Sequence, residues 1–121
     1  FPVAGNAAAT VRFKAGSSQL SSGDRGILRQ VVGAYRQRGG AIRVEGHASS
    51  RTRDMDLVQH HIVNFSVSLT RANVVARELV RLGIPAQAVF VVALSDSKPL
   101  FYEVMPAGDA GNQRVEIYFV N

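Results

Sequence analysis

The spacing of apolar positions changes along the chain and predicts alternating strands and helices. From Ser21 to Gly39, apolar residues recur every three or four positions, which is typical of a helix with one covered face. These apolar residues are Ile27, Leu28, Val31, Val32 and Tyr35. Ser21 or Ser22 is a suitable N-cap, and Gly39 with Gly40 ends the helix.

Three later segments have the patterns of strands. Apolar and charged residues alternate over residues 41–46, which indicates a strand with one covered face. Residues 89–94 and 115–120 are continuous apolar runs of strand length. The first of these three strands delivers a short polar segment at its C-terminal end, made of His47, Ala48 and Ser49.

A second helix is predicted over residues 69–82, with Ser68 as its N-cap and Gly83 as its C-cap. Its apolar side consists of Ala72, Val75, Ala76, Leu79 and Leu82. The preceding residues, 50–65, form a long connection in which 54–61 make at most an irregular helical turn. These bounds place Arg71 in the first turn of the helix, facing the loop 46–49.

With a short strand over 11–13, after a lead-in of residues 1–10, the order of elements is strand, helix, strand, helix, strand, strand. This order predicts an α/β two-layer sandwich, with two helices packed on one mixed sheet of about four strands. The length of 121 residues fits a single domain over 1–121.

Composition and motifs then exclude several classes of function. The chain has a net charge of +5 and a pI near 10.4, but its arginines are scattered and no aromatic-rich strand offers a base-stacking platform, so we expect no nucleic-acid partner. There is no cysteine, no phosphate-binding glycine loop and no nucleophile elbow, so we expect no enzyme and no cofactor. His47, His60 and His61 lack a recognised ligand spacing, and we expect packing or solvated histidines and no metal.

Arg71 is an unusual residue for a helix start, because the N-terminus of a helix already carries positive potential. A bound anion would explain an arginine there. The alternative is an ordinary ion pair with Glu45, Asp54 or Asp56.

The motifs of the chain resemble those of the OmpA C-terminal family, which includes Pal and MotB. The resemblance covers residues 11–120 and rests on an ordered series of segments: Gly46-His47-Ala48-Ser49, Asn64-x-x-Val67-Ser68-x-x-Arg71-Ala72, Gly83-Ile84-Pro85, Pro99 and Asn112-Gln113-Arg114-Val115-Glu116-Ile117. In the family these segments read G-H-T-D, N-x-x-L-S-x-x-R-A and N-R-R-V-E-I at the corresponding places. The resemblance implies the sandwich fold described above.

The resemblance also implies a function and a site. Members of the family bind peptidoglycan non-covalently, and they hold the diaminopimelate of the stem peptide between an aspartate and a helix arginine. By position the arginine is Arg71, whose guanidinium would take the carboxylate. His47 and Ala48 are the neighbouring motif residues, and Asn64 and Arg114 match second-tier positions at the pocket rim and in the last strand.

The family aspartate, however, is Ser49 in this chain. A serine cannot neutralise an ammonium group, so the resemblance implies an atypical or weakened pocket unless Asp54 or Asp56 acts as a substitute acid. The expected function is therefore a periplasmic peptidoglycan-binding module, with any attachment to the inner or outer membrane made through a segment outside this chain. The alternative is a degenerate member that serves as a structural or protein-interaction part of an envelope, secretion or motor complex.

Overall fold

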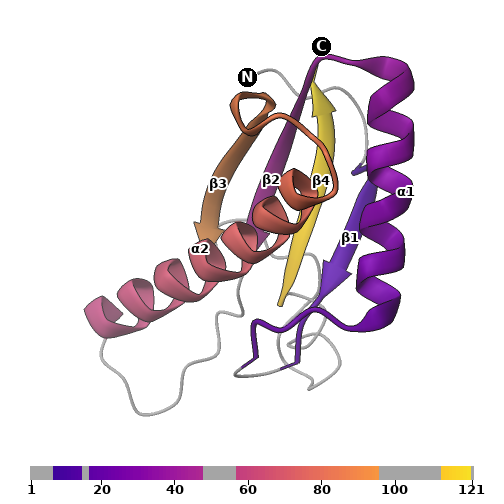
Figure 1. Cartoon of the computed structure of the whole chain (residues 1–121). Helices are drawn as coiled ribbons and strands as arrows, with labels where there is room; N and C mark the ends of the chain where they lie inside the picture. Colours follow the sequence, from indigo (N-terminus) through magenta and orange to yellow (C-terminus); the bar gives the residue numbers. More distant parts are fainter. Residues whose placement is uncertain (1–6, 15–16, 48–56, 96–112, 121) are drawn as a thin grey trace.

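A computed structural model of the chain describes residues 7–14, 17–47, 57–95 and 113–120, with side chains except at 57–65 and 95. Its elements are β1 (Ala9–Arg12), α1 (Ser22–Arg38), β2 (Ala41–His47), α2 (Leu57–Arg81), the short 3-10 helix η1 (Ala86–Ala88), β3 (Val89–Ser95) and β4 (Arg114–Val120). The predicted order of two helices and four strands is confirmed. Both helices lie on one face of a single sheet, so the predicted two-layer sandwich is also confirmed (Figure 1).

The sheet is mixed, with the strand order β1-β4-β2-β3. β2 runs parallel to β3, and β4 is antiparallel to both β1 and β2. Parallel strands need a long crossover connection, and α2 is the main element of the connection between β2 and β3. α2 packs over β2 and β3, and α1 packs over β1 at the other end of the sheet (Figure 1).

Alternation along the strands gives the sheet two different faces. Ile42 and Val44 of β2 and Ile117 of β4 are fully buried beneath the helices. They join an apolar core that also contains Val11, Leu28, Val31, Val32, Val75, Leu79 and Val115. The intervening residues of β2 and β4 extend from the opposite side, called the back face below, and they are Arg43, Glu45, His47, Arg114, Glu116 and Tyr118.

Helix α1 begins and ends close to the predicted residues. Ser21 is its N-cap: the Asp24 backbone N–H donates to the Ser21 hydroxyl at 3.0 Å, and the Ser21 backbone N–H donates to the Asp24 carboxylate at 2.9 Å. This reciprocal pair satisfies two N–H groups that the first turn of a helix leaves without partners. Gly39 adopts a φ of 67°, which favours glycine at the end of a helix.

The predicted start of α2 was wrong. The helix begins at Leu57 rather than Leu69, so most of the expected connection 50–65 is helical. Ser68 is fully buried within the helix and is not an N-cap. The apolar residues Val58, Ile62, Phe65 and Leu69 continue the helical spacing upstream, whereas Ser66 and Ser68 favoured a cap when the sequence was considered alone.

Gly46 explains why a serine is buried in the middle of α2. A Cβ atom at Gly46 would overlap the main-chain carbonyl of Ser68 and lie 3.0 Å from the Cβ of Ala72. The helix backbone therefore rests directly on β2 at this point, and only small residues fit on both sides.

The remaining element bounds differ little from those predicted. β1 starts at Ala9, inside the expected lead-in, because Ala9 pairs with Ile117 of β4. No helix in the described ranges has both the length and the apolar content that crossing a membrane requires.

Candidate functional site

Arg71 lies well inside α2 and is only 2% exposed. Its Nε donates to the carbonyl oxygen of Ser17 at 2.9 Å, and its Nη2 donates to the carbonyl oxygen of Lys14 at 3.1 Å and to Oε1 of Gln113 at 3.2 Å. The guanidinium also lies 5.3 Å from the centre of the Phe13 ring. Arg71 thus connects α2 to the segment after β1 and to the residue before β4.

The partners of Arg71 within the described residues are all uncharged. None of the described carboxylates forms an ion pair with it, and the two N–H groups of Nη1 make no hydrogen bond to any described residue. Burial lowers the pKa of Arg71, because the charged guanidinium is removed from water. An anion at Nη1 would use the remaining donors and offset the buried charge.

The predicted place of Arg71 at the start of a helix was wrong. Because α2 begins at Leu57, Arg71 is not in a first turn, and the positive potential of a helix N-terminus does not act on it. The proposed ion pair with Glu45 is also wrong, since Glu45 pairs with Arg43 on the back face, 2.7 Å from its Nε. Asp54 and Asp56 lie outside the described residues.

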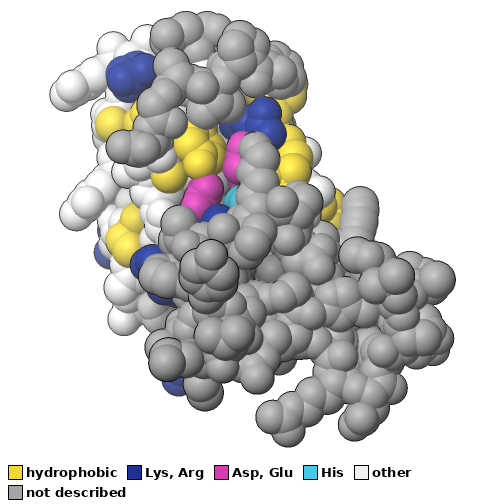
Figure 2. Space-filling view, turned by 180° about the vertical axis from the view of Figure 1, so that it is seen from behind, with side chains coloured by type: hydrophobic (Ala, Val, Ile, Leu, Met, Phe, Trp, Pro, Cys, Tyr) yellow, Lys and Arg dark blue, Asp and Glu magenta, His cyan; other side chains and the backbone are white. Residues whose placement is uncertain are grey.

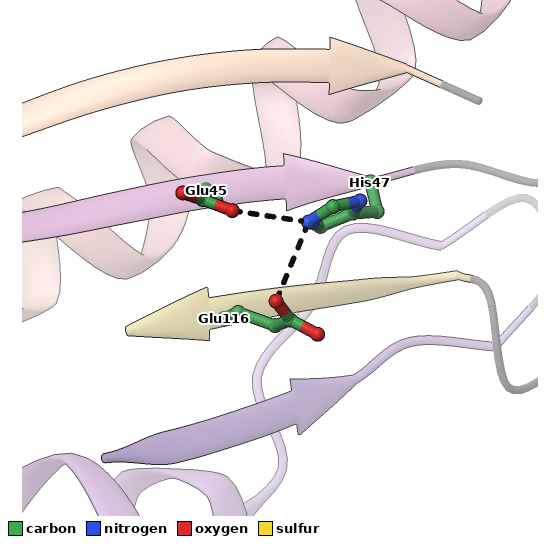
Figure 3. Close-up of side chains that lie close together, drawn as sticks. All are labelled: Glu45, His47 and Glu116. Atoms are coloured by element: carbon green, nitrogen blue, oxygen red, sulfur yellow. Dashed lines mark ion pairs between the residues drawn. The ribbon is translucent and has the colours of Figure 1, made fainter. Parts of the chain in front are cut away.

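The back face carries a second group of polar residues, in which acidic, basic and histidine side chains lie together (Figure 2). His47 is 1% exposed, and its Nε2 lies 3.5 Å from Oε1 of Glu45 and 3.6 Å from Oε1 of Glu116. The three side chains converge because Glu45 and His47, two residues apart, lie on the same face of β2. Glu116 of β4 is the register partner of Glu45 (Figure 3).

Two arginines hold the carboxylates of this cluster. Arg43 Nε lies 2.7 Å from Oε2 of Glu45, and Arg114 Nε donates to Oε2 of Glu116 at 2.7 Å. The hydroxyl of Tyr118 donates to the other oxygen of Glu116 at 2.6 Å. Both Oε1 atoms lie toward His47, and Oε1 of Glu116 also accepts the hydrogen bond from Tyr118.

The pKa values of the cluster follow from these contacts. Burial opposes ionisation of Glu116, but the Tyr118 hydroxyl and the Arg114 guanidinium outweigh it, and the pKa of Glu116 is lowered. Burial, with the charge of Arg114, lowers the pKa of His47 and favours the neutral imidazole. Burial and the hydrogen bond to Glu116 raise the pKa of Tyr118.

The sheet separates the residues predicted to form one site. His47 and Arg114 lie on the back face, whereas Arg71 reaches Gln113 on the side of the helices. Asn64 lies in α2, where only the backbone is described. Ala48 and Ser49, with the substitute acids Asp54 and Asp56, lie outside the described residues.

Sequence reasoning missed the residues that hold Arg71, which are Phe13, Gln113 and the carbonyls of Lys14 and Ser17. Main-chain acceptors carry no sequence signal, and Gln113 was available only as a member of the last motif. Strand alternation predicts that Glu45 and His47 lie on the same face of β2. The approach of Glu116 cannot be predicted in this way, because it depends on the register between β2 and β4.

Comparison with known proteins identifies a matching family and similar solved structures. A family model described as the OmpA family matches residues 12–113. No curated protein sequence matches the chain at a significant level.

Three solved structures illustrate the likeness. The peptidoglycan-associated lipoprotein from Burkholderia pseudomallei has a TM-score of 0.80 and 21% identity, over 92% of this chain and 89% of that one. The cell wall anchor of the T6SS from Pseudomonas aeruginosa has a TM-score of 0.74 and 27% identity, over 93% and 80%. The C-terminal domain of MotB from Helicobacter pylori has a TM-score of 0.77 and 17% identity, over 93% and 84%.

These structures share the order and layering of the elements, and the family model spans β2, both helices and β3. The resemblance inferred from the motifs is thereby confirmed. The chain belongs to the OmpA family.

Proposed function

We propose that this chain is a non-catalytic cell-envelope module that binds peptidoglycan non-covalently, with Arg71 as the residue that takes a carboxylate of the stem peptide. Membership of the OmpA family supports the general class, and two of the similar structures are a peptidoglycan-associated lipoprotein and a cell wall anchor. The observation that carries the proposal is the buried guanidinium of Arg71, whose described partners are all uncharged.

The chemistry of Arg71 suits a carboxylate better than a neutral group. Its Nε and Nη2 are fixed by three hydrogen bonds, so the plane of the guanidinium is set before a ligand arrives. Nη1 donates to none of the described residues, and a charge-assisted bond from it to a carboxylate is shorter and stronger than a neutral one. Diaminopimelate supplies such a carboxylate next to an ammonium group.

Ser49 makes the proposed pocket atypical, because it replaces the acid that would pair with the ammonium group. A lost charge-assisted bond of about 1.5–3 kcal/mol corresponds to an affinity lower by roughly ten- to a hundredfold. We therefore expect Ser49→Asp to strengthen the binding of a diaminopimelate peptide by about that factor, measured by calorimetry. An unchanged affinity would mean that Asp54 or Asp56 already supplies the acid or that the ammonium is not bound there.

Co-sedimentation with purified sacculi tests the proposal. The wild-type chain should pellet with sacculi, and Arg71→Ala should remain in solution. Because Arg71 also connects three segments, Arg71→Lys serves as a second variant that keeps the charge but loses the planar array of donors. Arg77→Ala is the matched control, since Arg77 is an exposed arginine of the same helix.

The outcome is interpretable only for folded variants, so each is checked by its thermal unfolding. Loss of pelleting in folded Arg71→Lys, with pelleting kept in Arg77→Ala, supports the proposal. A wild-type chain that stays in solution, or a folded Arg71 variant that pellets normally, contradicts it.

The proposed setting is the periplasm. The similar structures include domains of a lipoprotein, of a T6SS anchor and of MotB, and these names support an envelope location.

A second function is favoured by a separate surface. A shallow groove between α2 and β3 includes Val80, which is 38% exposed, and is otherwise lined by Asn73, Ala76, Arg77, Ala86, Val89 and Val91. β3 is also an edge strand of the sheet. A degenerate member that contacts an envelope protein through this groove would lose its partner in Val80→Asp and would not pellet with sacculi.

A further inference from the structure

The cluster of Glu45, His47 and Glu116 on the back face is not used by the proposed peptidoglycan site. Each of the three residues presents one ligand atom, and these atoms lie within 4.8 Å of one another. We propose that this cluster binds a divalent transition-metal ion, Zn²⁺, through Oε1 of Glu45, Nε2 of His47 and Oε1 of Glu116.

The distances suit a shared ion better than direct hydrogen bonds. Nε2 of His47 lies 3.5 Å and 3.6 Å from the two carboxylate oxygens, whereas a good N–H to O bond measures about 2.7–3.2 Å. Ligands that each lie about 2.0–2.1 Å from a tetrahedral zinc ion are separated by about 3.4 Å. The two separations at Nε2 are close to this edge length (Figure 3). The three ligand atoms together lie within 4.8 Å of one another, so the two carboxylate oxygens would move closer together when the ion binds.

His47 is an independent indication of a ligand. It is 1% exposed, yet neither Nδ1 nor Nε2 has a hydrogen-bond partner among the described residues. A buried polar atom without a partner is unfavourable, and a metal ion at Nε2 would satisfy it.

The surrounding residues orient the carboxylates as the outer shell of a metal site does. Arg43 and Arg114 contact the Oε2 atoms of Glu45 and Glu116, so neither arginine occupies an Oε1 atom. Tyr118 donates to Oε1 of Glu116, but a carboxylate oxygen accepts at two positions and retains one. The two arginines offset the two carboxylate charges, so we expect an affinity in the micromolar range, weaker than that of thiolate sites.

Three protein ligands leave one coordination position of a tetrahedral ion for water. The mixed imidazole and carboxylate donors favour Zn²⁺ over Mg²⁺ and Ca²⁺, which prefer oxygen ligands alone. This assignment departs from the sequence-based expectation of packing histidines, because only the register of β2 and β4 brings Glu116 to the pair on β2.

Calorimetric titration of the untagged chain with Zn²⁺ alone tests the proposal, together with the visible spectrum after Co²⁺ is added, which reports a tetrahedral site. We expect one ion per chain. Glu116→Gln and His47→Gln should each lower the affinity at least tenfold, because each removes one of three ligands. The matched control replaces both other histidines (His60→Ala with His61→Ala) and should bind as the wild type does.

If His47→Gln does not fold, Glu116→Gln and the NMR shift of the His47 ring nitrogens on addition of Zn²⁺ still decide the question. Unchanged ring shifts, no binding at micromolar Zn²⁺, or binding lost only in the His60 and His61 control would overturn the proposal. Sacculus binding is a separate measurement, so a failure of the metal site leaves the peptidoglycan proposal standing.

Discussion

Gly46 determines how closely α2 approaches the sheet, and through α2 it positions Arg71. The main chain of Ser68 rests on the place where a side chain of residue 46 would lie. Arg71 is less than one helical turn beyond Ser68, and its three hydrogen bonds require that α2 keep this separation from β2. A glycine at the end of a strand therefore affects a guanidinium on another element.

Gly46→Ala should lower the free energy of unfolding by about 3 kcal/mol, because the new methyl group forces the helix away from β2. Gly33→Ala is the matched control: nothing lies within 4 Å of a Cβ there, and alanine should stabilise α1 by about 0.5–1 kcal/mol. Urea unfolding of both variants measures the difference. Equal effects of the two substitutions would contradict the close contact.

At the scale of elements, α2 is one continuous helix whose middle, rather than its start, carries the candidate arginine. Serine residues near a helix start usually act as caps, so the sequence alone predicts an N-cap at Ser68. In the structure Ser68 lies inside the helix. Tertiary packing against Gly46 overrides that local preference, since a small side chain is needed where the two backbones meet.

Ser66→Pro tests the continuity of α2. Inside a helix, proline removes one hydrogen bond and collides with the preceding turn, so we expect a loss of about 3 kcal/mol in the free energy of unfolding. Ser22→Pro is the control, because Ser22 is the first residue of α1, a position that tolerates proline. If α2 began at Leu69, Ser66→Pro would be as mild as Ser22→Pro in chemical denaturation.

Glu78 contributes a pH-dependent contact within α2. Hydrogen bonds of 2.8 Å and 2.6 Å from Arg81 lower the pKa of Glu78 below 4.5, with smaller effects from Arg25 and Arg29 of α1. A lowered folded-state pKa stabilises the fold above pH 4.5, and this stabilisation is lost as the pH falls through the lowered value.

Glu78→Gln should therefore reduce the unfolding free energy only slightly at neutral pH, since the Arg81 side chain is 63% exposed and solvent screens the pair. The difference from the wild type should vanish in acid, below the folded-state pKa. Thermal unfolding across pH 2–7 checks this. A difference that persists unchanged at the acidic end would show that packing, not charge, is responsible.

At the scale of the whole molecule, the architecture could be predicted because periodicity and cap residues act locally. The alternation over 41–46, the apolar runs 89–94 and 115–120 and the cap at Ser21 each correspond to an observed element. The candidate site was less predictable. Gln113 and the carbonyls that hold Arg71 come from distant parts of the chain, and the pairing of His47 with Glu116 depends on strand register.

The whole fold also explains why the predicted site residues separate into two groups. A strand sends consecutive side chains to opposite faces, so Gln113 joins Arg71 while Arg114 joins Glu116. The proposed peptidoglycan carboxylate would therefore bind on the side of the helices, and the proposed metal ion would bind on the back face.

The most direct test of the central claim is an NMR titration of the chain with a diaminopimelate stem peptide and with the same peptide amidated at its carboxylates. We predict that the acid form perturbs the side-chain signals of Arg71 and Gln113, and that the amidated form binds roughly ten- to a hundredfold more weakly. Equal affinity for the two peptides, or perturbations confined to residues away from Arg71, would contradict the account.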